Sequence, residues 1–382
     1  MCGLTGSLEF EPTTPSQTLD RQIKAMTAQL RHRGPDSDGH WVDAVSGIGL
    51  GFRRLAIIDL SSAGSQPMTS HDNRFVIVYN GEVYNFPELR RDLLAKGHKF
   101  NGNSDTEVIL TAISEWGVAK AVNRFVGMFA IALWDKVDRS LYLIKDRLGI
   151  KPLYYGKFGR HLVFASELHA IRAHPAFDGT IDRGALTQFL KRNCIPTPQT
   201  IYGKVRKLPP GHMLKIGPAD EPELVAYWSL KDVVKAGQRQ PFGGDEEEAR
   251  SELERLLFEA VRCRMVADVP LGVFLSGGVD SSIVAALMQK QSIRPIKTFS
   301  IGNTNVKYDE AAYAKGVAHH LGTEHHELYL SESDALDVVP KLATIYDEPF
   351  ADSSQIPTYL VSKLARGHVT VALSGDGGDE LF

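Results

Sequence analysis

The chain has 382 residues, of which 43% are hydrophobic and 23% are charged, as in a soluble globular protein of two or three domains. Its net charge of -3 comes from scattered charges of both signs, and no apolar run approaches a membrane span, so neither a nucleic-acid nor a membrane partner is indicated. Three widely spaced cysteines, Cys2, Cys194 and Cys263, and the lack of a signal-peptide pattern favour a reducing compartment, and we expect a cytoplasmic protein.

The first predicted element is an amphipathic helix over residues 19–32, which ends at the turn-forming Gly-Pro-Asp of 34–36. Residues 75–85 predict a strand that runs into a turn. Asn85 and Pro87 then begin a helix that Gly97 ends. The apolar face of the first helix comprises Leu19, Ile23, Met26 and Leu30.

Ser104 and Glu107 have the spacing of a capping box, which predicts another helix. The apolar runs 128–134 and 141–144 are separated by a short polar stretch and predict a β-hairpin. Residues 217–248 are rich in polar residues, proline and glycine, and we expect a domain boundary there.

Strands and helices alternate beyond this boundary, which predicts a parallel sheet with helices on both faces. The predicted strands are 270–275, 296–301, 325–330 and 368–373, and the predicted helices are 281–290, 309–321 and 355–366. Ligands of such sheets bind at the carboxyl ends of the strands. Both glycine-rich stretches of this half, 276–282 and 374–380, fall at such ends.

Cys2 is a candidate nucleophile. Methionine aminopeptidases remove Met1 when the next side chain is small, so Cys2 would become the mature N-terminus. Its α-amino group, with a pKa of about 8 in model peptides, could then accept the thiol proton directly or through a water. A lone cysteine at this position is more often incidental, so the interpretation depends on further residues of the same site.

Four motifs follow Cys2 in order: RHRGPD at 31–36, GFRRLAIID at 51–59, YNGEVYN at 79–85 and SDTEV at 104–108. Together with Cys2 they resemble the class II glutamine amidotransferase domain. The resemblance implies an α+β N-terminal-nucleophile (Ntn) glutaminase sandwich over residues 2–215, in which Cys2 releases ammonia from glutamine.

The resemblance also implies roles for single residues. Arg53 would hold the glutamine α-carboxylate, a task that suits a planar guanidinium. Asp105 would hold the glutamine ammonium group. Asn80 and the backbone N–H of Gly81 would form the oxyanion hole. Glu82 would help to bind the substrate amino group or orient its loop.

The loop Ser-Gly-Gly-Val-Asp-Ser at 276–281 is a candidate phosphate site, because its N–H groups and the following helix N-terminus suit an anion. It has neither the lysine nor the spacing of a Walker A loop. The motifs TFSIG, YDEAAYA, LGTEHHE, EPFADSS and SGDGGDELF follow it in order. The set resembles the synthetase domain of asparagine synthetases and β-lactam synthetases, and implies an α/β parallel-sheet ATP pyrophosphatase-type domain over 245–382, after a linker at 216–244.

This second resemblance implies ATP as a substrate and Mg²⁺ as a cofactor. Asp280 would ligate the Mg²⁺ ion, since a hard cation prefers carboxylate oxygen. The departing pyrophosphate would be held by Ser276, Gly277, Gly278 and Ser281. The adenine and ribose would contact Leu275 and Ile301, and the nucleotide and intermediate would lie near Ser374 and Gly375.

Three carboxylates would act on the acceptor. Asp376 stands where many relatives have a glutamate that assists formation of aspartyl-AMP, and aspartate is shorter by one methylene. Asp379 would bind the acceptor's amino group, and Asp352 is a weaker candidate for the same neighbourhood.

Four histidines could suggest zinc, but their spacing matches no metal motif, and we expect structural or nucleotide-adjacent roles. They are His319, His320, His325 and His326.

The resemblances together imply a glutamine-dependent asparagine synthetase, in which ammonia released at Cys2 displaces AMP from an adenylated aspartate. The products would be asparagine, AMP and pyrophosphate, and the resemblance allows a homodimer. One alternative is a related amidotransferase that acts on another carboxylate, on a sugar or a metabolite. A second is a non-catalytic protein that binds glutamine or ATP.

Relatives of this kind continue beyond the SGDGGDELF segment with further helices and a lysine that stabilises charge during adenylation. The chain as given ends at Phe382. We therefore expect either a fragment or a protein whose synthetase half is incomplete.

Overall fold

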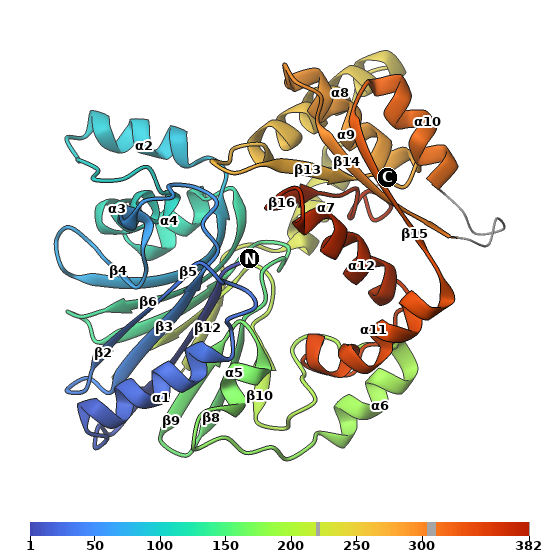
Figure 1. The fold of residues 1–382 in the computed structure, drawn as a ribbon. Helices are drawn as coiled ribbons and strands as arrows, with labels where there is room; N and C mark the ends of the chain where they lie inside the picture. Colours follow the sequence, from blue (N-terminus) through green and yellow to red (C-terminus); the bar gives the residue numbers. More distant parts are fainter. Residues whose placement is uncertain (219–221, 304–310, 382) are drawn as a thin grey trace. The chain divides into compact units, whose positions relative to one another are not determined.

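The computed structural model describes residues 1–218, 222–303 and 311–381 (Figure 1). Residues 308–310 of the YDEAAYA motif, which include the predicted start of a helix, lie outside this set. So do residues 219–221 of the expected linker and the last residue of SGDGGDELF. No helix in the described ranges is long and apolar enough to cross a membrane.

The described residues form two compact units. The first comprises Met1–Gln240 together with Asp347–Ala351, and the second comprises Pro241–Tyr346 together with Asp352–Phe382. The short segment Asp347–Ala351 therefore packs with residues that precede it by more than one hundred positions.

Two six-stranded sheets make up the first unit, and every described pairing in them is antiparallel. One sheet has the order β10 (Val205–Lys207), β8 (Tyr154–Phe158), β9 (His161–Ala165), β1 (Gly3–Glu9), β3 (Ile48–Arg54) and β2 (Ser37–Asp43). The other has the order β12 (Pro222–Ala226), β11 (His212–Ile216), β7 (Ser140–Lys145), β6 (Gly127–Asp135), β5 (Phe75–Val83) and β4 (Met68–Thr69).

Apolar side chains from both sheets meet in one buried cluster. Leu4 and Phe52 of the first sheet share it with Val78 and Trp134 of the second. A second cluster joins the outer face of one sheet to α1 (Ser16–Ala28), α5 (Leu168–Arg172) and α6 (Arg183–Arg192). A third joins the other sheet to α2 (Phe86–Ala95), α3 (Asp105–Trp116) and α4 (Val118–Arg124) (Figure 1). This layered sandwich is the predicted Ntn fold.

Local patterns predicted several of these elements correctly. The apolar face of the first helix is buried, and the hairpin is formed by β6 and β7. The capping box at Ser104 is only half formed. Ser104 Oγ accepts the N–H of Glu107, but the Glu107 carboxylate accepts N–H groups of Asn101 and Gly102 instead of closing the box. The Glu107 carboxylate therefore accepts from the turn at residues 101–102 and is not available to the N–H of Ser104.

Residues 216–244, expected as a linker, contain regular structure. β12 pairs with β11, and α7 (Leu230–Arg239) begins at the cap Ser229, whose side chain accepts the N–H of Asp232. The helix α8 (Glu246–Arg264) was not predicted, because its glutamate- and arginine-rich sequence has a polar composition. Three Glu–Arg pairs spaced i,i+3 and a capping box at Asp245 stabilise it.

The second unit contains a parallel sheet with the order β15, β14, β13, β16. Its strands are β13 (Leu271–Phe274), β14 (Lys297–Asn303), β15 (Glu324–Leu330) and β16 (Val371–Leu373). Its further helices are α9 (Val279–Gln291), α10 (Ala311–Leu321), α11 (Glu332–Ile345) and α12 (Gln355–Arg366). The predicted parallel α/β sheet is confirmed, and α11 is an additional helix.

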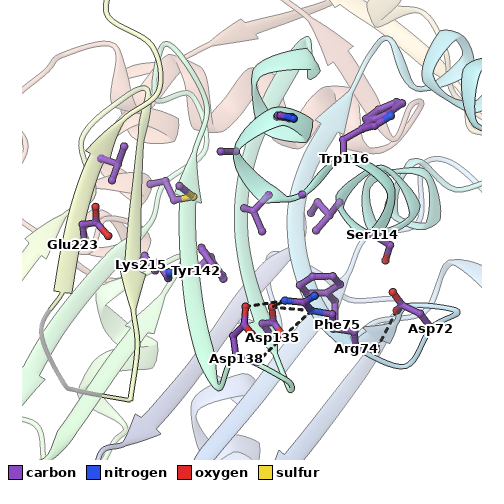
Figure 2. Close-up of a pocket in the computed structure, with 17 residues that line it drawn as sticks. Asp72, Arg74, Phe75, Ser114, Trp116, Asp135, Asp138, Tyr142, Lys215 and Glu223 are labelled. Atoms are coloured by element: carbon purple, nitrogen blue, oxygen red, sulfur yellow. Dashed lines mark hydrogen bonds and ion pairs between the residues drawn. The ribbon is translucent and has the colours of Figure 1, made fainter.

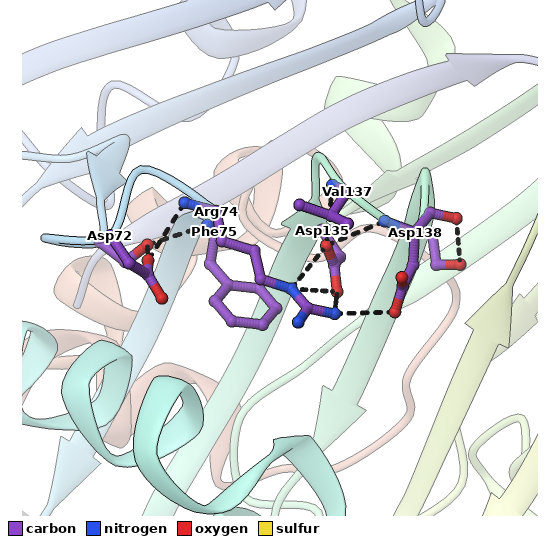
Figure 3. A network of polar contacts seen from close by, with 8 residues as sticks. Asp72, Arg74, Phe75, Asp135, Val137 and Asp138 are labelled. Atoms are coloured by element: carbon purple, nitrogen blue, oxygen red, sulfur yellow. Dashed lines mark hydrogen bonds and ion pairs between the residues drawn. The ribbon is translucent and has the colours of Figure 1, made fainter.

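A polar clasp joins two turns of the first unit (Figure 3). Arg74, directly before β5, donates to both carboxylate oxygens of Asp135, and its Nη2 also donates to Asp138 Oδ2 at 2.8 Å. Asp72 Oδ1 accepts the Arg74 backbone N–H at 3.1 Å. The clasp lies in a pocket that includes Trp116 (Figure 2). Because its guanidinium and carboxylates are paired with one another, we interpret the network as structural.

The segment Asp347–Ala351 is bound to the first unit by its carboxylates. Asp347 accepts the backbone N–H groups of Leu168 and His169 at 2.7 and 3.0 Å, and it pairs with the His169 ring. Glu348 pairs with Lys207 and accepts the N–H of Ile201. These contacts make the segment part of the glutaminase-like fold despite its position in the sequence.

We expect Asp347→Ala to destabilise the first unit by about 1–3 kcal/mol, because buried donors at the start of α5 lose their acceptor. Asp347→Asn should cost less, since it keeps one acceptor oxygen. Burial raises the pKa of Asp347, and the nearby Glu167 carboxylate acts in the same direction, so the amide also removes a repulsion.

Urea unfolding followed by tryptophan fluorescence measures this effect, because all four tryptophans lie in the first unit. The control is Asp337→Ala, an exposed residue of α11. Equal midpoints for the Asp347→Ala variant and the wild-type protein would contradict the structural role of the segment.

Candidate active site

Cys2 lies at the start of β1, next to the end of β3, because Gly3 pairs with Arg53 in the antiparallel register. The Cys2 Sγ accepts the N–H of Leu55 at 3.4 Å and lies 3.5 Å from the Leu55 carbonyl. Burial raises the pKa of the Cys2 thiol, while the Leu55 hydrogen bond and the N-terminal ammonium act in the opposite direction. The Cys2 thiol therefore lies where these two inner strands of the sheet end and begin, and it is held there by backbone contacts.

Arg33 is a site residue to which the sequence assigned no role. Its Nε donates to the Cys2 carbonyl at 2.9 Å, and its Nη1 donates to Glu167 Oε1 at 2.8 Å. The RHRGPD motif was the signal that could have identified it. Arg54 donates to the carbonyls of Asp59 and Ser61 and so holds the loop after β3, which is a structural role.

Arg53 lies between β1 and β2 in the sheet, opposite Gly3 on one side and Asp38 on the other. Its Nη1 donates to Asp38 Oδ1 at 3.1 Å. Its Nε is buried and has no partner among the described residues. Since the Asp38 side chain is 58% exposed, this ion pair is weak, and the guanidinium can exchange it for another carboxylate.

Asn80 and Gly81 lie near the carboxyl end of β5. Asn80 is 1% exposed, and its Nδ2 has no partner among the described residues. A Cβ on Gly81 would lie 2.1 Å from the Met128 carbonyl of the neighbouring strand, so only glycine fits this backbone. Asn80 thus presents a buried, unpaired donor. The residue after it must be glycine, because the neighbouring strand leaves no room for a side chain there.

Asp105 lies at the first turn of α3 and is 6% exposed. Its Oδ2 accepts the Tyr79 hydroxyl at 2.7 Å and the Val83 N–H at 3.1 Å, so it is tied to both sides of Asn80. Burial raises the pKa of Asp105, and the Tyr79 hydrogen bond acts in the opposite direction. Glu82 is half-buried at the end of the same strand.

The unpartnered buried side-chain atoms of this site are all donors. They are Arg33 Nη2, Arg53 Nε and Asn80 Nδ2. A buried donor without an acceptor costs about 1–3 kcal/mol, and such groups are rare in folded proteins. Arg33 donates to the Cys2 carbonyl and Arg53 lies opposite Gly3, so two of these donors lie beside Cys2, and the third belongs to the predicted oxyanion-hole residue Asn80. Unpaired donors of this kind suit a ligand with several acceptor oxygens.

In the second unit, the loop 276–281 follows β13 and leads into α9. Ser276 Oγ and Ser281 Oγ lie 2.9 Å apart, and the Gly278 N–H donates to Ser276 Oγ at 3.2 Å. Gly277 has a φ of +83°, and a Cβ there would lie 2.7 Å from the backbone N of Ala314. The loop is thus a tight turn at a helix N-terminus, as predicted.

The second glycine-rich loop, 374–380, follows β16, which is the parallel neighbour of β13. The two loops are in contact. A Cβ on Gly375 would lie 2.8 Å from the backbone N of Ser281, and one on Gly378 would lie 2.2 Å from Asp280 Oδ2. The structure therefore brings these predicted nucleotide residues together at one edge of the sheet.

The remaining predicted residues of this unit lie in several different places. Leu275 is 1% exposed in the apolar core, and Ile301 lies further along β14. Asp376 is exposed and accepts the Ser374 hydroxyl at 3.0 Å, and Asp379 is exposed on the same loop. Asp352 is exposed in the turn before α12, where its carboxylate accepts the Ser354 N–H at 2.8 Å.

Two of the four histidines make structural contacts. The His325 ring contacts the hydroxyls of Thr298 and Ser300 at 2.8 and 3.2 Å. The His326 ring stacks on Phe299 with 5.3 Å between centroids. Both rings therefore brace β14 and β15. His319 and His320 lie in the last turn of α10.

The fold and the site define an Ntn-type glutamine amidotransferase unit joined to an ATP pyrophosphatase-type unit. The glutamine amidotransferase domain family matches residues 1–228, and the asparagine synthase family matches residues 252–382. The chain belongs to the glutamine-hydrolysing asparagine synthetase family.

Several curated proteins are similar to the whole chain. Asparagine synthetase [glutamine-hydrolyzing] 1 of Bacillus subtilis is 38% identical over 382 residues, which are 100% of this chain and 58% of that protein. The provisionally named asparagine synthetase [glutamine-hydrolyzing] 2 of Methanocaldococcus jannaschii is 38% identical, covering 100% of this chain and 75% of that protein. Amidase chry2 of Gibberella zeae is 30% identical, covering 100% and 59%. The chain thus spans little more than half the length of two of these relatives.

Proposed function

We propose that the protein is a glutamine-dependent asparagine synthetase, in which Cys2 hydrolyses glutamine and the ammonia attacks an ATP-activated aspartate. The observation that carries the proposal is the set of unpartnered buried donors on Arg33, Arg53 and Asn80. Glutamine bound beside Cys2 brings the matching acceptors, a carboxylate and a carbonyl that becomes an oxyanion.

In the first step, Met1 is removed and the α-amino group of Cys2 accepts the thiol proton. Arg53 exchanges Asp38 for the glutamine α-carboxylate, and Asp105 takes the glutamine ammonium group. The thiolate attacks the amide carbon, and Asn80 Nδ2 and the Gly81 N–H stabilise the oxyanion. The ammonium formed in this way then protonates the amide nitrogen as the C–N bond breaks, which releases neutral ammonia and leaves a thioester. Water hydrolyses the thioester to glutamate and the free thiol.

In the second unit, the two contacting loops hold ATP. Ser276, Gly277, Gly278 and Ser281 donate to the departing pyrophosphate, as the N–H groups at a helix N-terminus favour an anion. The Asp280 carboxylate fits Mg²⁺, which often uses one or two carboxylates together with phosphate oxygens. Bound there, the ion would neutralise phosphate charge.

The acceptor would lie beside the second loop. Leu275 and Ile301 would border the adenine and ribose, and Ser374 and Gly375 the intermediate. Asp376 would assist adenylation. Asp379, with Asp352 as a weaker candidate, would bind the amino group of aspartate.

The relative named amidase chry2 motivates a second candidate, an amidotransferase for another carboxylate. The two are separated by supplying glutamine, ATP and Mg²⁺ with aspartate, and in parallel with sugar acids and other amino acids. With a complete synthetase half, we expect AMP, pyrophosphate and asparagine to form with aspartate in equal amounts. AMP and amide formation only with another acid would select the second candidate, and ATP-independent glutamine hydrolysis with no amide from any acid would reject both.

A further inference from the structure

Lys151 is a buried lysine beside the N-terminus that neither the proposed mechanism nor any sequence motif uses. Its side chain is 5% exposed, and its ammonium donates to the Met1 thioether at 3.1 Å. A thioether is a weak acceptor, so it does not compensate for the removal of a charged group from water. Such costly placement of an ionisable group next to a nucleophile suggests a function.

The loop that carries Lys151 is rigidly organised around one carboxylate. Asp146 accepts the backbone N–H groups of Phe129, Leu148, Ile150 and Lys151 at 3.0–3.2 Å. Gly149 in the same loop has a φ of +74°, which a residue with a side chain rarely adopts. The backbone position from which the Lys151 side chain extends is therefore fixed by the fold.

Most of the charges around Lys151 belong to residues of the candidate active site, and one belongs to the carboxylate that organises its loop. They are Glu82, Asp146, Arg33 and Cys2. Burial lowers the pKa of Lys151, whereas the carboxylates of Glu82 and Asp146 raise it and Arg33 lowers it. The thiol of Cys2 is acted on in addition by the N-terminal ammonium, Asp105 and Arg54.

We propose that Lys151 is a positioning residue for the nucleophile, a fixed cation that promotes the thiolate and the neutral α-amine of Cys2. The proposal rests on the proposed role of Cys2. The Lys151 ammonium contacts the side chain of the residue bonded to Cys2, and the charges of Lys151 and Cys2 interact. Removal of Met1 therefore leaves this cation near the new terminal amine. A neighbouring positive charge disfavours protonation of an amine and favours ionisation of a thiol. The first effect keeps the amine free of a solvent proton, so that it can serve as the base, and the second stabilises the thiolate that attacks glutamine.

Removal of the Lys151 charge should shift the pH dependence of glutamine hydrolysis to higher pH. Without the cation, the pKa values of the amine and the thiol both rise, so the active form appears only at higher pH. We expect Lys151→Met to move the acid limb of kcat/KM for glutamine hydrolysis upward by about 0.5–1 pH unit, and to slow iodoacetamide alkylation of Cys2 at pH 7 by about 3–10-fold, since one pKa unit is a factor of ten. Lys151→Arg should retain most of both properties.

The matched control is Lys145→Met. Lys145 is also buried, at 7% exposure, and it also lies next to Asp146, but the charges that act on it are Asp146 and Lys207 and do not include Cys2. Its pH profile and alkylation rate should equal those of the wild-type protein. Cys194 and Cys263 serve as internal references when alkylation is followed by peptide mass spectrometry, and intact mass verifies removal of Met1. If Lys151→Met fails to fold, Lys151→Gln takes its place.

A drop in activity without a shift of the pH profile or of the alkylation rate would overturn the proposal, because it would assign Lys151 a structural role only. Unchanged behaviour of the variant in both assays would also overturn it. A shift in alkylation in a protein that does not hydrolyse glutamine would support Lys151 and reject the proposed function of Cys2. The alkylation rate thus distinguishes failure of the Lys151 proposal from failure of the proposed function of Cys2.

Discussion

Cys2→Ala should abolish glutamine hydrolysis, with a loss of about 10³-fold or more, as expected for removal of a catalytic nucleophile. The variant isolates the thiol. Alanine is also small, so Met1 should be removed as in the wild-type protein, and the terminal amine remains. The hydrogen bonds of the thiol are to the Leu55 backbone, and Cys2 packs only at the margin of the buried cluster between the sheets, so alanine should leave the fold intact. Ammonia release from glutamine measures the effect.

Cys194→Ala is the control for the general effect of losing a cysteine. Cys194 lies after α6, outside the residues that surround Cys2, and its substitution should leave hydrolysis unchanged. Retention of more than one tenth of wild-type activity in the Cys2→Ala protein would contradict a covalent mechanism at Cys2. Intact mass should show that active wild-type protein lacks Met1, because a blocked amine cannot accept the thiol proton.

Asn80→Ala should lower kcat for glutamine hydrolysis by about 10²–10³-fold, the usual loss for one oxyanion-hole donor. The KM should change little, because the donor acts on charge that develops only in the transition state. Stability should be nearly unchanged, since Asn80 Nδ2 has no partner that the substitution would leave unpaired. Single-turnover hydrolysis and urea unfolding measure the two properties.

Asn85→Ala is the control, and we expect it to lower stability without lowering kcat. Asn85 lies in the same YNGEVYN motif, but its side chain donates to the Arg124 carbonyl and accepts the Val126 N–H, both at 2.9 Å. Its removal should reduce stability by about 1–2 kcal/mol, as expected for lost backbone hydrogen bonds, and leave kcat intact. If Asn80→Ala lowered stability and left kcat unchanged, Asn80 would be structural and the oxyanion hole would lie elsewhere.

Several features could be predicted because they depend on local patterns. Residues 355–366 form a helix with the predicted bounds, and the loop 276–281 turns between a strand and a helix as predicted. Periodicity and turn residues decide such elements within a few positions. The α8 helix escaped prediction because its stability comes from charged pairs and a capping box, and a polar composition also fits a linker.

The order of the motifs by itself determined the family and the residue types that a glutamine site and a nucleotide site require. The tertiary structure alone decided which of those residues meet. Arg33 reaches the Cys2 carbonyl across 31 positions, Lys151 reaches Met1 across 150, and Asp347 caps α5 across 179. Local sequence sets the conformation and polarity of a segment. Packing of distant strands then decides which buried donors find an acceptor within the protein and which remain for a substrate, and that depends on the whole fold.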